Sequence, residues 1–137
     1  MNRRKLREQI FKLLFGVEFN EKAEIPLQVK LFFEDEDNAA DAQDTQYITD
    51  KFNEIVNKIP EMDALVNEVA QGWSTSRMGK VELTLIRIAT YEMLYDESVP
   101  TSVAINEAVE LCKKFGQEES AGFVNGVLAK VAKQNAS

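Results

Sequence analysis

The sequence predicts an all-α protein with seven helices in two small helical bundles. Apolar residues recur at spacings of three and four nearly throughout the chain, which is the period of an amphipathic helix. No segment alternates apolar and polar residues as a strand does, and the Asn-Gly pair at 125–126 lies inside a helical pattern. We expect a single domain over residues 1–137, with a three-helix bundle over about 1–59 and a four-helix bundle over about 60–137.

Composition restricts the chemistry that the chain can perform. It has 16 Lys and Arg against 23 Asp and Glu, a net charge of -7 that disfavours indiscriminate nucleic-acid binding. Histidine is absent and Cys112 is the one cysteine, which excludes histidine-based nucleophile systems and the usual zinc sites. We therefore predict no enzymatic activity, no cofactor and no metal. A lone cysteine and the lack of an apolar run of about 20 residues favour a cytoplasmic protein.

The first half of the chain predicts four helices. The first covers residues 2–19, and the second begins at Pro26, which suits a first helical turn, and ends in the acidic run 34–38. That run lacks the glycine and the distal glutamate of a calcium loop, so we expect a solvated loop. A third helix stops at Pro60, and a fourth follows at once and ends at Gly72.

The second half predicts three more helices. Residues 81–95 are apolar on most of the helix circumference, which indicates a central buried helix in which Glu92 accepts buried hydrogen bonds. The sixth helix runs from Pro100 to Gly116 and the seventh begins at Ser120. Gly126 in mid-helix suggests that another group packs closely there, with Asn125 bonding across helices.

Positive charge is concentrated at the start of this acidic chain, on Arg3, Arg4, Lys5 and Arg7. Such charge is mildly unfavourable at a helix N-terminus, so an anionic ligand is its simplest explanation. On a helical projection a strip of guanidinium groups and rings forms beside the apolar stripe, a combination that suits single-stranded RNA. In the alternative interpretation, which helical spacing leaves open, the two phenylalanines of the strip widen the core face. The strip consists of Arg4, Arg7, Phe11 and Phe15.

Four stretches of the sequence resemble the NusB family of bacterial transcription antitermination factors. They are RRKLREQIFKLLF, VELTLIRIATYEML, VPTSVAINEAVELCKKFG and FVNGVLAKVA, which follow one another in order over nearly the whole chain. The resemblance implies an all-helical fold of two bundles and binding to the boxA element of nascent RNA. It also implies ribosomal protein NusE as heterodimer partner, in a complex that lets RNA polymerase read through termination sites, notably in ribosomal RNA operons.

The resemblance also assigns residues. The arginine-rich segment that contacts boxA in the family matches Arg3, Arg4, Lys5 and Arg7. Phe15 occupies a place where the family often has tyrosine, so it can stack on a base but cannot donate a hydroxyl hydrogen bond. Glu82 matches a position tied to RNA and partner binding. A weaker set for the RNA or partner surface contains Phe11, Phe115, Glu119 and Phe123.

Two other functions remain open at this point. NusB-like domains also occur ahead of RNA methyltransferase domains, but no glycine-rich cofactor loop or catalytic cysteine motif follows here, which disfavours that form. A helical adaptor without an RNA role would leave the basic segment unexplained. The sequence does not decide between a monomer and a homodimer of the free protein, and it assigns no individual NusE contact.

Overall fold

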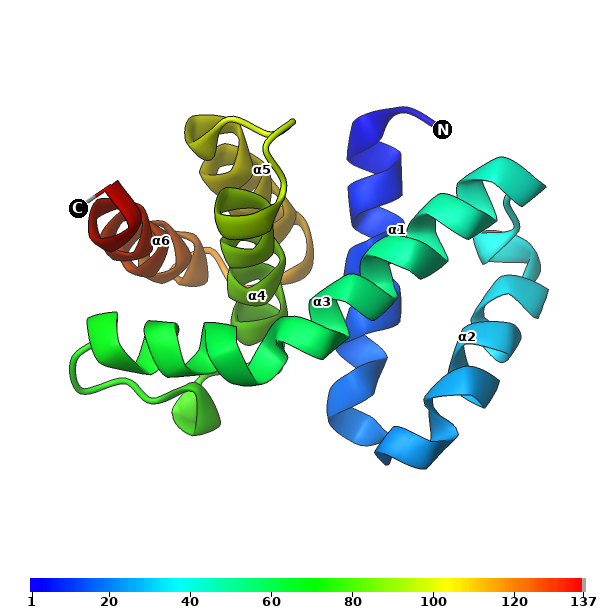
Figure 1. Cartoon of the computed structure of the whole chain (residues 1–137), viewed down its shortest axis with the longest axis horizontal. Helices are drawn as coiled ribbons and strands as arrows, with labels where there is room; N and C mark the ends of the chain where they lie inside the picture. Colours follow the sequence, from blue (N-terminus) through cyan, green and yellow to red (C-terminus); the bar gives the residue numbers. More distant parts are fainter. Residues whose placement is uncertain (137) are drawn as a thin grey trace. The chain divides into compact units, whose positions relative to one another are not determined.

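The computed structural model describes residues 1–136, which form six α-helices and no strand. The all-α class is confirmed, and the prediction of seven helices is wrong by one. No helix in this range is long and apolar enough to cross a membrane. The helices are α1 (Arg3–Phe15), α2 (Ile25–Glu34), α3 (Ala42–Val69), α4 (Lys80–Tyr95), α5 (Thr101–Phe115) and α6 (Ser120–Ala136) (Figure 1).

The predicted third and fourth helices are one helix, α3, with Pro60 in its interior. Proline removes one hydrogen bond, to the carbonyl of Val56, and costs about 3 kcal/mol in a helix interior. Burying one large apolar side chain contributes about 1.5–3 kcal/mol, and the apolar stripe continues in register past the proline. Its buried members before and after Pro60 are Ile48, Phe52, Ile55, Met62 and Val66. Their burial outweighs the missing bond, so the helix continues.

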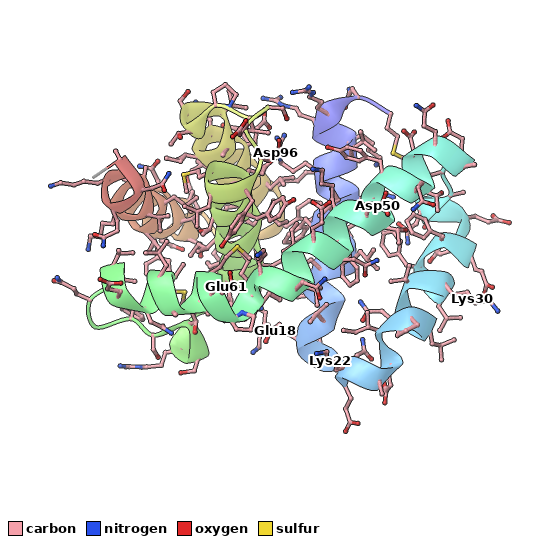
Figure 2. The ribbon with its side chains drawn as sticks, viewed as in Figure 1. Glu18, Lys22, Lys30, Asp50, Glu61 and Asp96 are labelled. Atoms are coloured by element: carbon pink, nitrogen blue, oxygen red, sulfur yellow. The ribbon has the colours of Figure 1, made fainter. Side chains whose placement is uncertain are left out.

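The chain forms two compact units, which divide between Val56 and Asn57. The first contains α1, α2 and the first part of α3. Helix α1 ends at Phe15 rather than at the expected residue 19, and residues 16–19 form a 3-10 helix. A side chain of α2 provides a hydrogen bond to a backbone carbonyl in the last turn of α1. Gln28 donates from Nε2 to the Leu13 carbonyl oxygen over 2.9 Å. Helix α2 has no buried residue, and Lys30 projects outward from it (Figure 2).

The second unit is built around α4, whose residues 83–91 are all buried. Helices α4, α5 and α6 pack on one another in all three pairs. The central position of α4 agrees with its apolar circumference. Glu92, expected to be buried, is partly exposed, because it lies one residue beyond this run near the end of the helix. Arg87 of the same helix is buried and binds Asp63 of α3.

Two glycines of the second unit have different explanations. A Cβ on Gly116, directly after α5, would lie 2.9 Å from the Cys112 carbonyl oxygen, so a close approach requires glycine there. A Cβ on Gly126 would meet nothing within 4 Å. The expected close packing at Gly126 is therefore wrong. Gly126 and Asn125 are both exposed, since they lie opposite the buried stripe of α6 that holds Val124 and Leu128.

Candidate functional site

The basic segment opens α1 in the first unit. Arg3, Arg4 and Lys5 are all exposed. The Asn2 side chain caps the helix by accepting a hydrogen bond from the Lys5 backbone N–H over 2.8 Å, and the first turn has no acidic residue. Unsatisfied N–H groups give a helix N-terminus partial positive charge. The three cations therefore add to a positive helix end, an arrangement that attracts anions.

The rest of the expected Arg-Phe strip is not a surface strip. Arg7 is 8% exposed and Phe11 is 3% exposed, so both belong to the buried face of α1. The interpretation in which the phenylalanines widen the core face is correct for Phe11. Phe15 is half-buried, and its ring lies between Phe11, at 6.0 Å between centroids, and the exposed Phe19, at 5.3 Å. Phe15 thus keeps a partly accessible ring nearly three helical turns beyond the last of the exposed cations.

Glu82 lies at the start of α4 in the second unit, three residues after the N-cap Gly79. Its carboxylate accepts a hydrogen bond from the Ser120 hydroxyl at the start of α6, with 2.5 Å between the oxygens. A Cβ on Gly79 would clash with the same carboxylate, so glycine leaves room for this side-chain position. Glu82 is partly exposed, and its orientation is fixed by a group from another helix.

Cys112 is fully buried beside this carboxylate. Burial raises the pKa of its thiol, and the negative charge of Glu82 raises it further. The thiol is therefore protonated at neutral pH, which makes it a poor nucleophile. The polar group that this region holds in a defined orientation is the Glu82 carboxylate.

Two aromatic rings and a cation lie near the start of α6. Phe123 lies one turn after Ser120, and its ring packs edge-on against Trp73, with 5.6 Å between centroids. The Arg77 guanidinium lies over the Trp73 ring, 5.9 Å from its centroid. We name this set the Glu82 cluster; its members are Glu82, Ser120, Phe123, Trp73 and Arg77.

The other residues singled out from the sequence lie on α5 and near it. Phe115 is half-buried at the end of α5, with the Lys114 ammonium 5.4 Å from its ring centroid. Glu119 is exposed directly before α6. Glu119 adjoins the Glu82 cluster through its neighbour Ser120.

Sequence reasoning missed three members of the cluster. Trp73 and Arg77 lie in WSTSRMGK, whose turn formers indicate only a connection, and Ser120 indicates only the start of a helix. One signal in the sequence could have pointed to them. Trp73 and Arg77 are four residues apart in a short connecting segment, where a core does not call for a large ring or a cation. Only the fold places Phe123 beside them, because it comes from the far end of the unit's sequence.

Comparison with known proteins supplies the family of these helices. The model of the NusB family matches residues 4–133. A protein of Agathobacter rectalis named transcription antitermination protein NusB is 49% identical over 132 residues, which cover 96% of this chain and all of the relative.

Solved structures agree. NusB of T. maritima superposes with a TM-score of 0.83 at 31% identity, covering 98% of this chain and 92% of that one. A structure described as antitermination factors NusB and NusE in complex with dsRNA contains a chain with a TM-score of 0.78. That chain is 24% identical and the match covers 96% of each chain, so it supports the fold alone.

Proposed function

The chain belongs to the NusB family, and on that premise we propose that it is a transcription antitermination factor that binds the boxA element of nascent RNA. In this proposal it acts as a heterodimer with ribosomal protein NusE, and the complex lets RNA polymerase read through termination sites, notably in ribosomal RNA operons. Its two units act together as one NusB-like domain. The protein works by binding, without a catalytic step.

The observation that carries this proposal is the exposed basic start of α1. An acidic protein with net charge -7 places Arg3, Arg4 and Lys5 in consecutive exposed positions, next to a capped helix N-terminus. Lysine and arginine neutralise phosphates, and helix N-termini add N–H donors for the same groups. The segment is thus suited to hold an RNA backbone.

The other proposed RNA contacts are a stacking ring and a hydrogen-bonding carboxylate. Phe15 offers a partly exposed ring on which a base can stack. Glu82, fixed by Ser120, can accept hydrogen bonds from the amino groups of bases, and its charge repels phosphate. Phe115, Glu119 and Phe123 extend the surface for RNA or NusE.

Two observations favour NusE as the partner: the complex of a structural relative and the negative charge of this chain. The antitermination complex described for a structural relative contains NusB, NusE and dsRNA. A basic partner would offset the negative field of this chain, which otherwise weakens the attraction of RNA.

The test is charge reversal at the start of α1. We expect Arg3→Glu with Arg4→Glu to lower boxA affinity by about 10- to 100-fold, because two phosphate contacts become repulsive. The matched control is Lys22→Glu with Lys30→Glu, which changes the net charge equally at two exposed lysines of the same unit (Figure 2). Fluorescence anisotropy of labelled boxA RNA and of a scrambled RNA, at two salt concentrations and with NusE present, measures the effect.

Each result has a clear meaning. A loss confined to the arginine pair supports RNA binding at α1. Equal losses in both variants would mean that only net charge matters, and would contradict a site at α1. Equal weak binding of boxA and scrambled RNA in every mixture would overturn the proposal and favour a helical adaptor.

A further inference from the structure

Trp73 is a largely exposed aromatic side chain of the second unit. Its side chain is 53% exposed, and it lies in the connection between α3 and α4. Tryptophan is enriched at binding surfaces because its large apolar ring carries a polar N–H, so an exposed ring in a connecting segment suggests a ligand.

The exposure of Trp73 is not the result of a loosely held loop. The Trp73 backbone N–H donates to the Ala70 carbonyl over 2.8 Å, which closes the turn after α3. Two residues later the Thr75 N–H donates to the Asn67 side-chain oxygen over 2.7 Å. Residues 75–77 then form a 3-10 helix. The backbone that carries the ring is therefore held by hydrogen bonds at Trp73 and at Thr75.

Two neighbours orient the Trp73 ring. Phe123 of α6 packs against it with an interplanar angle of 68°. The Arg77 guanidinium lies 5.9 Å from the ring centroid, and Arg77 is itself exposed. The three side chains combine two rings with one delocalised cation.

We propose that Trp73, Arg77 and Phe123 form a stacking site for one unpaired base of bound RNA. The base stacks on the exposed part of the indole, Phe123 supports the indole from the side, and Arg77 binds the phosphate next to the stacked base. Indole and guanidinium groups both stack on bases without regard to sequence, and each stacked base adds affinity. The site continues from Glu82 through Ser120, so it extends the proposed RNA surface within the second unit.

RNA is a better occupant than a protein for two reasons. A protein partner typically binds an aromatic anchor in a well-packed pocket from which water is excluded. Here Trp73 is exposed and has a cation over its ring, which is a polar surrounding for an aromatic side chain. A nucleotide offers a flat base for the ring and a phosphate for the cation in one ligand.

This inference rests on the proposed function, and the chain provides a local probe for testing it. Trp73 is the only tryptophan, so intrinsic fluorescence at tryptophan wavelengths reports on this ring alone. We expect boxA RNA to quench it, with NusE present, at the same concentrations at which labelled RNA shows binding by anisotropy. Any tryptophan in NusE is replaced by phenylalanine or subtracted with a NusE-only titration.

Variants then separate stacking from charge. We expect Trp73→Leu to weaken RNA binding by about 5- to 100-fold, and Trp73→Phe to restore most of it, because a ring is what stacks. Arg77→Gln should reduce the slope of log affinity against log salt by about 0.7, the value for one phosphate contact in single strands, whereas Trp73→Leu leaves the slope unchanged. Far-UV circular dichroism confirms that each variant is folded.

Tyr95→Leu is the matched control. Tyr95 is also an exposed ring of the second unit with a cation over it, Lys58 at 5.0 Å, but it lies at the other end of α4 from the connection that holds Trp73. A 16-residue helix separates its two ends by about 24 Å. We expect no change in RNA affinity for this variant.

An abasic scan identifies the base. RNAs that lack one base at a time are titrated against the original protein and Trp73→Leu, and at the stacked position the substitution has no further effect. RNA binding without quenching and without a Trp73→Leu defect would overturn this inference and leave the proposed function intact. No RNA binding by anisotropy would overturn both. A Trp73→Leu defect in NusE binding with unchanged RNA binding would assign the ring to the protein partner instead.

Discussion

Arg87 is buried in α4, and its guanidinium binds the Asp63 carboxylate of α3 through two parallel hydrogen bonds. Nε donates to Oδ1 over 3.0 Å and Nη2 donates to Oδ2 over 2.7 Å. The side chains are 9% and 19% exposed, so water screens the pair only partly. A two-pronged contact of this kind fixes direction as well as distance, which joins the last part of α3 to the central helix of its unit.

Replacing one residue of the Arg87–Asp63 pair should reduce stability more than replacing both by apolar residues. We expect Asp63→Ala to lower the free energy of unfolding by about 3 kcal/mol, because it removes the two-pronged carboxylate contact of a buried guanidinium. The double variant Arg87→Met with Asp63→Leu should lose less free energy of unfolding than Asp63→Ala alone, since it removes both charges of the pair. Urea denaturation followed by circular dichroism measures both. A double variant that is less stable than the single one would show that the pair itself contributes net stability.

Helix α3 illustrates the element scale, where local preference and burial compete. Pro60 cannot donate a hydrogen bond to the Val56 carbonyl, and the boundary between the two compact units follows directly after Val56. The helix nevertheless continues for nine residues beyond the proline, to Val69. Its apolar stripe is buried on both sides of Pro60.

Pro60→Ala tests this account. It restores a backbone donor at an exposed position, so we expect the free energy of unfolding to rise by about 1–3 kcal/mol, with no loss of helical signal. Thermal unfolding followed by circular dichroism measures the change. A clear fall in stability would mean that the helix geometry around the proline is needed by the units that it connects.

At the scale of the whole molecule, charge is distributed unevenly. The chain has net charge -7, yet its first helix begins with three exposed cations. Counter-charge from a partner would reduce the repulsion between the acidic remainder and RNA, and simultaneous contact with two proteins would add binding energy.

We therefore expect low boxA affinity for the protein alone and about 5- to 150-fold higher affinity with saturating NusE, the usual range of coupling between two binding sites. By thermodynamic linkage, boxA RNA should raise the affinity for NusE by the same factor. Isothermal titration calorimetry in both orders measures the two factors. Equal boxA affinity with and without NusE would contradict the cooperative model.

Most of the helices could be predicted from the sequence, because their causes are local. Apolar spacing indicated them, and Gly116 and Pro100 marked real ends. The prediction failed at Pro60, where a strong local signal opposed a weaker but longer apolar stripe. It failed again at Gly126, because a helical glycine has the same sequence signal whether a neighbour packs on it or solvent covers it.

In the candidate site, too, some features follow from the local sequence and others only from tertiary packing. Consecutive charges such as Arg3, Arg4 and Lys5 remain exposed wherever the helix lies, because burying three adjacent cations is too costly, so the sequence alone determined that part of the surface. Arg7 and Phe11 follow on the same helix, and only tertiary packing decided that they are buried. Only the fold, likewise, placed Phe123 of α6 against Trp73 and gave Glu82 a hydroxyl from another helix. Helix formation and charge exposure depend on neighbours along the chain, whereas these contacts join residues at least 38 positions apart and exist only once the helices have packed.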